Sequence, residues 1–352
     1  MAGTRRTAAT GIALVLAAAV ASCSSSSNAS NAQGSAAPGG TASPGSEAAG
    51  FQDTLVKIVE KVDASVVEVR TATGVGSGVV FDSNGDIVTN AHVVGTATAL
   101  KIASQSGIIG NATLVGAFSP DDLAVVRMSG GGAQLPPATF ADSSKLRVGD
   151  IVLAIGNPLG LTSSVTEGIV SATGRTISEG NNIVIPDAVQ TSASINPGNS
   201  GGALVDLSGE VVGIPTLAAI VPELGGSAAP GIGFAIPSNI ARDIATQIIT
   251  SGKVTNSHRA YIGLGQVASV VDSSGRAAGC LVGGVVAGGP ADKAGLQAGD
   301  IIVSIGGTAT PTAERLAAAL ATLEPGQTVD VDFVRGGQTR HTPLTLGEYP
   351  GS

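Results

Sequence analysis

The sequence predicts a mainly β protein: an antiparallel double barrel followed by a smaller β domain. Glycine accounts for 51 of the 352 residues and tryptophan is absent. Short runs rich in valine and isoleucine recur between the glycines, a pattern typical of β-strands. Roughly ten such runs follow one another without long helices between them, which favours barrels or sandwiches over an alternating α/β fold. A chain of this length can hold two or three domains.

Charge and cysteine content exclude several classes of protein. Only 12% of the residues are charged, and 26 acidic against 18 basic residues give a net charge of −8. Without a cluster of lysine and arginine there is no phosphate footprint, so we expect no nucleic acid partner. Three scattered histidines do not make a metal site, and two cysteines do not make a disulfide framework. We therefore expect neither a metal nor another cofactor.

Residues 1–23 have the features of an export signal. Arg5 and Arg6 form a positively charged start, and the apolar run Gly11–Ala21 is shorter than the ~20 residues that a membrane-spanning helix needs. The run is followed by "VASC", which resembles the lipobox of bacterial lipoproteins, where cleavage leaves a lipidated cysteine, here Cys23. We expect a lipoprotein on the periplasmic or cell-wall side of the cell membrane. The alternative is an ordinary signal peptide that is cut elsewhere.

Changes in composition divide the rest of the chain. Residues 24–50 are mostly Ser, Ala, Gly, Pro and Asn and cannot bury a core, so we expect a disordered tether with a reach of about 30 Å. Residues 51–252 carry most of the strand-like runs and form the first domain. A linker is expected at 253–259 and the second domain at 260–348.

Local signals predict the elements of the first domain. A short helical piece is expected at Thr54–Val62, and Asn84-Gly85 between two apolar runs predicts a hairpin. Further strands are expected at Ala99–Ile102, Ala112–Phe118, Leu123–Met128, Ile151–Ile155, Ser164–Thr173, Ile183–Ser192, Gly202–Val205 and Glu210–Ile214.

Two longer helices are predicted by apolar residues that recur every three or four positions. In the first helix Ile240, Ile244 and Ile248 share a face. Ser238 is its expected N-cap and Gly252 its expected end. The second helix lies in the second domain and buries a stripe of leucines: Leu316, Leu320 and Leu323.

A serine in a bare, glycine-rich turn is the first candidate for chemistry. Ser200 lies in "INPGNSGG" and is either a turn residue or a nucleophile beside exposed N–H donors. A serine hydroxyl needs a base to take its proton and a third group to orient that base. His92, in "TNAHVV" at the end of a predicted strand, is the candidate base. Asp122, in "DDLAVV", is the candidate orienting acid, with Asp121 as the alternative.

A second arrangement around the same serine is possible in principle. "GNSGG" also fits G-x-S-x-G, the nucleophile elbow, in which the acid and the histidine follow the serine. Asp292 or Asp300 and His341 would then be the partners of Ser200. An elbow needs a helix directly after the serine, but "GGALVDLSGEVVGI" predicts a hairpin. The order histidine, aspartate, serine is therefore preferred.

The glycines near Ser200 also suit a site for a negatively charged oxygen. The N–H groups of Gly198 and Ser200, with Asn199 between them, can converge on one point. This requires Gly198 to take a conformation that other residues disfavour. Each donor of such an oxyanion hole contributes about 3 kcal/mol to transition-state stabilisation.

Taken together, "TNAHVV", "DDLAVV" and "NPGNSGG" resemble the HtrA/DegP family of trypsin-like serine proteases. "GNPLG" and "GFAIPS" extend the resemblance, which covers Phe51 to the chain end. It implies a chymotrypsin-like fold of two six-stranded barrels with His92, Asp122 and Ser200 as the catalytic triad. It also implies a homotrimer and an ATP-independent endopeptidase that degrades misfolded or unfolded extracytoplasmic proteins.

The second domain resembles the PDZ domain that such proteases carry. "GGPADKAGLQAGDIIVSIGG" resembles the PDZ core, and "YIGL", which starts at Tyr261, resembles the carboxylate-binding loop. The N–H groups of Ile262, Gly263 and Leu264 would receive the C-terminal carboxylate of a peptide lying between a strand and a helix. The alternative is a β appendage that binds nothing.

The residues before and after the serine predict the specificity pocket. Trypsin-like enzymes place an acid six residues before the nucleophile, but this chain has Ser194 there. With Ile195, Ile214 and Thr216 as further lining residues, we expect a preference for small or medium aliphatic P1 residues. Pro215 departs from the family pattern, because this substrate-pairing strand usually offers an N–H. If Ile214 and Thr216 face the substrate, the missing donor points away.

Other interpretations carry less weight. A chaperone or peptide-binding scaffold with little proteolytic activity is the alternative function, although the complete His, Asp and Ser set argues against it. A nucleotide site at "GVGSG" (74–78) is excluded, because no helix follows to receive a phosphate. Cys280, in "GCLVGGVV", is expected to be a small buried apolar residue.

Overall fold

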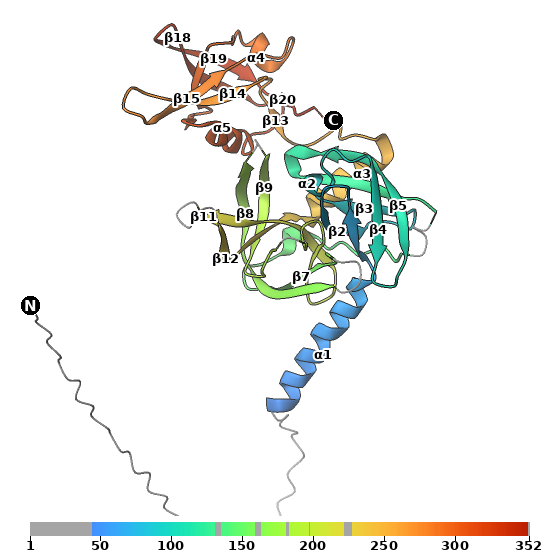
Figure 1. Ribbon diagram of the computed structural model, residues 1–352. Helices are drawn as coiled ribbons and strands as arrows, with labels where there is room; N and C mark the ends of the chain where they lie inside the picture. Colours follow the sequence, from blue (N-terminus) through green and yellow to red (C-terminus); the bar gives the residue numbers. More distant parts are fainter. Residues whose placement is uncertain are drawn as a thin grey trace, which may run out of the picture.

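Two closed barrels followed by a separate β domain make up the protein (Figure 1). The computed structural model describes residues 44–130, 135–158, 163–180, 183–196, 198–221 and 227–350. The predicted mainly β class with two six-stranded barrels is confirmed. The export signal with Cys23 lies outside the described residues.

The first barrel follows a long helix, α1 (Pro44–Asp63), whose C-terminal half packs on the body through Ile58 and Val62. The strands close in the order β1-β2-β3-β6-β5-β4, and every neighbouring pair is antiparallel. The elements are β1 Val66–Arg70, β2 Val75–Val80, β3 Asp86–Thr89, α2 Ala91–Val94, β4 Ala99–Ser104, β5 Ile109–Phe118, the 3₁₀ turn η1 Ser119–Asp121 and β6 Leu123–Met128.

The second barrel closes in the order β10-β11-β12-β9-β8-β7 and is followed by a helix, α3. The predicted hairpin after Ser200 is confirmed, because β10 turns into β11 at Gly209, whose φ is 69°. The elements are η3 Ser143–Lys145, β7 Ile151–Gly156, β8 Ser164–Gly180, β9 Ile183–Thr191, β10 Ala203–Val205, β11 Val211–Val221, β12 Ser227–Pro237 and α3 Ser238–Ser251.

Strands buried on both faces join the two barrels. In β7, Val152 and Ala154 belong to the core of the second barrel, whereas Leu153 and Ile155 belong to a cluster shared with the first barrel. Successive side chains of a strand point to opposite faces, so one strand supplies both cores. This shared cluster also contains residues of α1 and α3, and we call it the inter-barrel core.

The second domain has its own hydrophobic core around one six-stranded sheet system. Cys280 is buried within this core, as predicted. The leucine stripe is partly confirmed, because Leu316 is buried and Leu320 is half-buried. The helix ends at Leu320, so the prediction that Leu323 belongs to it is wrong, although Leu323 also packs half-buried against this core. The elements are β13 Ala260–Tyr261, β14 Val267–Val271, β15 Ala277–Val282, α4 Pro290–Lys293, β16 Ile301–Ile305, β17 Thr308–Ala309, α5 Ala313–Leu320, β18 Thr328–Arg335, β19 Gln338–Thr345 and β20 Gly347–Glu348.

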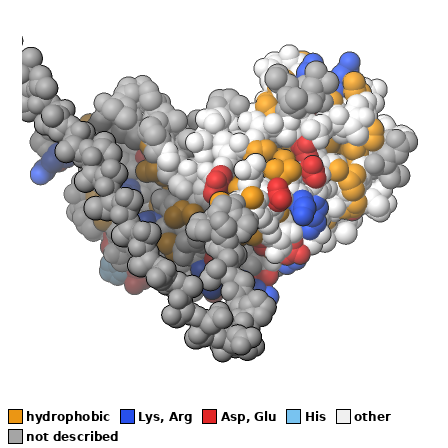
Figure 2. Space-filling view, turned by 90° about the horizontal axis from the view of Figure 1, so that it is seen from below, with side chains coloured by type: hydrophobic (Ala, Val, Ile, Leu, Met, Phe, Trp, Pro, Cys, Tyr) orange, Lys and Arg blue, Asp and Glu red, His pale blue; other side chains and the backbone are white. Residues whose placement is uncertain are grey.

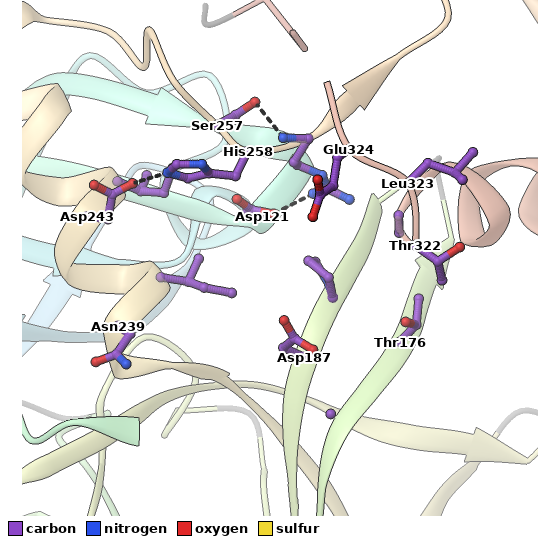
Figure 3. A pocket seen from close by; sticks show the side chains of 16 residues that line it. Asp121, Thr176, Asp187, Asn239, Asp243, Ser257, His258, Thr322, Leu323 and Glu324 are labelled. Atoms are coloured by element: carbon purple, nitrogen blue, oxygen red, sulfur yellow. Dashed lines mark hydrogen bonds and ion pairs between the residues drawn. The ribbon is translucent and has the colours of Figure 1, made fainter. Parts of the chain in front are cut away.

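A buried ion pair ties the linker to the first domain. The guanidinium of Arg259 binds the carboxylate of Asp121 and the carbonyl of Pro120. Burial raises the pKa of Asp121 to about 6, although Arg259 acts in the opposite direction. Beside this pair a cavity of about 630 Å³ opens between the domains, with Asp243 and Glu324 on its walls (Figure 3).

The end of the chain strengthens the same junction. The ring of Tyr349 packs edge-on against Phe118 of β5, with ring centres 6.0 Å apart, and against Tyr261, with ring centres 5.4 Å apart. The N–H of Tyr349 donates to the carbonyl of Arg259 (2.9 Å). The linker and the C-terminal strand therefore reach the first barrel at one place.

The boundary of α1 corrects the sequence prediction. The helix begins at Pro44, so its first residues belong to the segment 24–50 that was expected to be a tether, and it extends well beyond Thr54–Val62. Proline is favoured in the first turn of a helix, and alanines such as Ala48 and Ala49 have high helix propensity. The absence of large apolar residues in this part hides the helix from a pattern based on buried stripes.

The start of α3 also differs from the prediction. The N-cap is Pro237, and Ser238 is the first helical residue. The hydroxyl of Ser238 donates to the carbonyl of Ala141 (2.7 Å), so it joins the helix to the preceding loop and caps nothing. The predicted end is confirmed, because Gly252 is left-handed (φ 73°) and its N–H donates to the carbonyl of Ile248 (2.8 Å).

On the face shown in Figure 2, basic side chains lie apart from one another, among acidic and apolar ones. In the part of the chain that the structure describes, no helix combines the length and the apolar character needed to span a bilayer.

We predict that the thiol of Cys280 resists alkylation in the folded protein. Burial, and secondarily the charge of Glu314, raise its pKa to about 11. At pH 8 only about 0.1% of such a thiol is ionised, and the thiolate is the reactive form. Iodoacetamide labelling at Cys280, followed by peptide mapping, should be about 100-fold slower in the native protein than in urea. Equal rates in the two states would contradict the buried position.

Candidate active site

A histidine and a buried aspartate meet at the end of the first barrel. His92 lies in the short helix α2 directly after β3, not in the strand itself. Its Nδ1 is 2.7 Å from Oδ2 of Asp122, and its backbone N–H donates to Oδ1 (2.9 Å). A carboxylate only accepts, so Nδ1 carries the proton of the neutral ring and Nε2 is left as the acceptor. This is the tautomer that a general base needs.

The backbone around Asp122 fixes the direction of its side chain. Asp122 follows η1 in the left-handed region (φ 51°, ψ 39°), which aspartate tolerates better than most residues. Its carbonyl accepts from the N–H of Ala91 (3.0 Å) and from Nδ2 of Asn90 (3.0 Å). Asp122 is fully buried. The turn that carries the acid is therefore bonded directly to the start of the helix that carries His92.

Thr216 of the second barrel connects Asp122 to Ser200. Its hydroxyl donates to Oδ2 of Asp122 (2.7 Å), the same oxygen that faces His92. Its carbonyl accepts from the hydroxyl of Ser200 (2.8 Å). The four residues form one connected network across the two barrels, in which Thr216 lies between Asp122 and Ser200.

Two glycines allow the serine loop to approach its surroundings. Gly198 has a φ of 115°, and a Cβ there would lie 2.5 Å from the Cβ of Pro158. Gly201 has a φ of 79°, and a Cβ there would lie 2.3 Å from the carbonyl oxygen of Ser77. Both positions require a residue without a side chain. Both glycines adopt a backbone conformation that other residues disfavour, which is the reason for glycine that the sequence suggested.

Asn199 holds the serine loop in shape. Its N–H donates to the carbonyl of Asn196 (3.2 Å), and its Oδ1 accepts the N–H of Asn196 (3.0 Å). Its Nδ2 donates to the carbonyl of Ser194 (3.0 Å). Because the N–H of Asn199 is used inside the loop, the candidate donors of an oxyanion hole are the N–H groups of Gly198 and Ser200.

The expected pocket residues differ in their surroundings. Ser194 is exposed, whereas Ile195 and Ile214 are buried and belong to core clusters. The hydroxyl of Thr216 donates to the carboxylate of Asp122. The expected preference for small or medium aliphatic P1 residues therefore depends on Ser194. A basic P1 residue would need an acid at this position, and serine carries no charge.

Pro215 contacts the serine loop through its carbonyl, so this contact does not need the N–H that proline lacks. Its carbonyl accepts the N–H of Gly201 (2.9 Å), and it pairs with Ala235 of β12. The carbonyl of Thr216 meanwhile faces Ser200. The contacts of β11 with the serine loop are made by carbonyl groups, which proline keeps.

The elbow arrangement is excluded by the positions of its partners. Asp300 binds Arg335 through both carboxylate oxygens, and Asp292 accepts the N–H of Gly288 (2.8 Å). His341 is exposed on β19 of the second domain. None of the three lies in the network around Ser200.

In the proposed peptide site of the second domain, the loop directs a backbone N–H away from the neighbouring segment. The carbonyl of Ile262 accepts the N–H of Ala291 (2.8 Å), and Gly263 has a φ of 79°. Leu264 faces Val285 in an antiparallel bridge whose hydrogen bonds are made by the flanking residues. In such a pair the residue's own N–H points away from its partner. β14, which continues this loop, is an edge strand of its sheet.

Sequence reasoning missed three contributions to the site. Ser77 bonds to the serine loop, Asn90 bonds to the backbone of Asp122, and Thr216 acts through its hydroxyl. Ser77 lies in the "GVGSG" run that was considered only as a nucleotide loop. A buried serine between two glycines of a strand is the signal that could have identified it.

The fold and the site define a class of protein. Among the described residues, no group of three or more His, Cys, Asp or Glu side chains is placed to hold a metal ion. A His–Asp pair on one barrel, joined to a serine loop on the other, is the arrangement of trypsin-like serine peptidases. Here that domain is followed by a second β domain with an open strand edge.

Comparison with known proteins agrees with this class. Residues 76–214 match the trypsin-like peptidase domain, and residues 260–346 match the PDZ domain. The chain is 40% identical over 277 residues to the periplasmic pH-dependent serine endoprotease DegQ of Escherichia coli, covering 78% of this chain and 59% of DegQ. It is 38% identical over 282 residues to a probable periplasmic serine endoprotease, DegP-like, of Chlamydia trachomatis, covering 78% and 54%. The chain spans a little over half the length of these relatives.

Solved structures show the same likeness. The HtrA-type protease AlgW with a decapeptide has a TM-score of 0.58 and 31% identity, covering 84% of this chain and 98% of that one. The serine endoprotease from Yersinia pestis has a TM-score of 0.57 and 36% identity, with the same coverage. The chain belongs to the HtrA family of serine proteases.

We predict that the two adjacent aspartates differ sharply in their effect on activity. Asp122→Asn should lower kcat by roughly 10³- to 10⁴-fold, because an amide no longer holds the imidazole in the correct tautomer. Asp121→Asn should leave kcat within about threefold, since its side chain faces Arg259 and an amide oxygen still accepts from it. Peptide hydrolysis at pH 7.5 measures both. Equal losses in the two variants would contradict the assignment.

Proposed function

We propose that this protein is an ATP-independent serine endopeptidase that degrades misfolded or unfolded proteins outside the cytoplasm. The observation that carries the proposal is the bonded network of His92, Asp122, Thr216 and Ser200 across the two barrels. Family membership supports the substrate class, and the periplasmic names of the relatives support the location.

The geometry supports a mechanism in two acyl-transfer steps. The Ser200 hydroxyl, which donates to the carbonyl of Thr216 in this structure, turns to Nε2 of His92, which takes its proton. The serine oxygen then attacks the substrate carbonyl and forms a tetrahedral intermediate. The N–H groups of Gly198 and Ser200 stabilise the negative oxygen. His92 then gives its proton to the leaving amine, and water releases the acyl group by the reverse sequence. Asp122 stabilises the imidazolium throughout.

The surroundings of the catalytic domain extend the proposal. The lipobox at Cys23 supports attachment of the exported protein to the cell membrane through a lipid. The open edge of β14 and the loop Tyr261–Leu264 support binding of C-terminal peptides for substrate capture or regulation. Family resemblance supports a homotrimer. No cofactor is needed for the chemistry proposed here.

The direct test is labelling by a fluorophosphonate probe, which reacts only with an activated serine. The probe should modify Ser200 in the native protein, as located by digestion and mass spectrometry. Ser200→Ala should remove the label, and His92→Ala should slow it by at least about 10³-fold. A native protein that takes no label, or takes it at another serine, would contradict the proposed function.

The peptide site has its own test. A fluorescent peptide with a free C-terminal carboxylate should bind the full chain, and the same peptide with a C-terminal amide should bind at least about tenfold more weakly, since the loop N–H groups then lose a charged acceptor. Gly263→Val should remove the difference, because this position has a φ of 79° and a Cβ would lie 2.9 Å from Pro290. Fluorescence anisotropy measures all three. Equal binding of acid and amide would refute the site.

A further inference from the structure

Ser77 of β2 is a buried polar residue whose bonds the proposed mechanism does not use. It is fully buried between Gly76 and Gly78. Its N–H donates to the carbonyl of Ser200 (2.9 Å), and its hydroxyl donates to the carbonyl of Gly198. The hydroxyl also accepts the N–H of Asn157 (2.8 Å). One residue of the first barrel thus makes three hydrogen bonds to the second barrel, two of them to the serine loop.

We infer that Ser77 is a positioning residue that fixes the serine loop of the second barrel against the histidine of the first. This inference rests on the proposed function, because it assigns Ser77 a role in the same reaction. The inferred role of Ser77 involves no contact with the substrate. It acts through the backbone on both sides of Ser200.

The two bonded carbonyls determine how the loop can turn. A peptide unit is planar, so a fixed carbonyl also fixes the N–H of the next residue. Gly198 shares its peptide unit with Asn199, whose N–H donates to Asn196 (3.2 Å). Ser200 shares its peptide unit with Gly201, whose N–H donates to Pro215 (2.9 Å). In each of the two peptide units, Ser77 of the first barrel binds the carbonyl, and a carbonyl of the second barrel accepts the N–H.

The position of Ser77 links this loop to the base. β2 pairs with β3, and Thr89 at the end of β3 donates its hydroxyl to the carbonyl of Ser77 (2.6 Å). The next residues of the chain are Asn90, which bonds to Asp122, and the helix that carries His92. Ser77 therefore lies on the strand next to the one that leads to His92, and it is hydrogen-bonded to the serine loop.

A hydroxyl suits this position better than other small side chains. It donates to one buried backbone group and accepts from another at the same time, which neither alanine nor glycine can do. Loss of the hydroxyl leaves the Gly198 carbonyl and the Asn157 N–H without this partner, and the loop can then turn away from the transition-state geometry. A displacement of about 1 Å at a reacting group costs on the order of 10²-fold in rate.

The test compares two buried serines that each donate to a backbone carbonyl. Ser77→Ala removes the bond to Gly198, and Ser238→Ala removes the bond from α3 to Ala141, which is not one of the bonds of the network around Ser200. Both variants are made in the full chain, and their urea unfolding midpoints are compared. We expect both variants to lose stability, so Ser238→Ala shows how far a loss of stability alone affects the kinetics.

Kinetics separate positioning from stability. Ser77→Ala should lower kcat about 10- to 100-fold with KM within about threefold, whereas Ser238→Ala should keep both. A peptide aldehyde, which forms a tetrahedral adduct on the serine, should lose affinity for Ser77→Ala by the same factor as kcat. The corresponding peptide alcohol, which forms no adduct, should bind unchanged.

Several results would overturn the inference. A Ser77→Ala protein with unchanged kcat, or with equal losses of aldehyde and alcohol binding, would show that Ser77 supports only the fold. If Ser77→Ala does not fold, Ser77→Cys keeps a similar volume with a weak donor and should show an intermediate loss of kcat; unchanged kcat in that folded variant would also refute the inference. An inactive wild-type protein would contradict the proposed function instead.

Discussion

The inter-barrel core is the constraint on which the site depends. Leu153 and Ile155 of β7 lie there in one cluster with residues of the first barrel such as Val66 and Phe118. Asp122 of the first barrel accepts from Thr216 of the second, and the carbonyl of Ser200 accepts from Ser77 of the first, so the network exists only while the barrels keep one relative position. Close-packed interiors resist small displacements, and the cost of moving the barrels apart is shared by many apolar contacts. The polar network can therefore be small.

The buried charge of Asp122 explains much of the polar arrangement. A carboxylate removed from water costs several kcal/mol unless hydrogen bonds replace its solvation. Three donors do so: the His92 N–H, the His92 ring and the Thr216 hydroxyl. Charge-assisted bonds of this kind are stronger than neutral ones. Two of these bonds hold the carboxylate in place, and the third orients the imidazole, so the groups that make the buried acid tolerable also prepare the base for proton transfer.

Local patterns predicted the parts of the fold that local physics determines. β6 has the predicted bounds Leu123–Met128, because a compact apolar run follows a polar turn, and the Asn84-Gly85 hairpin joins β2 to β3 as expected. The contacts of Ser77 were not predictable in this way. Ser77 and Gly198 are 121 positions apart, and no periodicity in either segment encodes their pairing. Asp122, which was preferred to Asp121, lies against the His92 ring, and only the backbone turn gives the physical reason for this placement.

That turn also explains why two neighbouring acids have unlike surroundings. Asp121 ends η1 and Asp122 follows it in the left-handed region, so the two side chains leave the backbone in different directions. One carboxylate meets the linker residue Arg259, and the other meets His92. The linker is itself bonded to Tyr349 at the chain end. A single peptide bond thus separates the residue that anchors the linker of the second domain from the acid of the site.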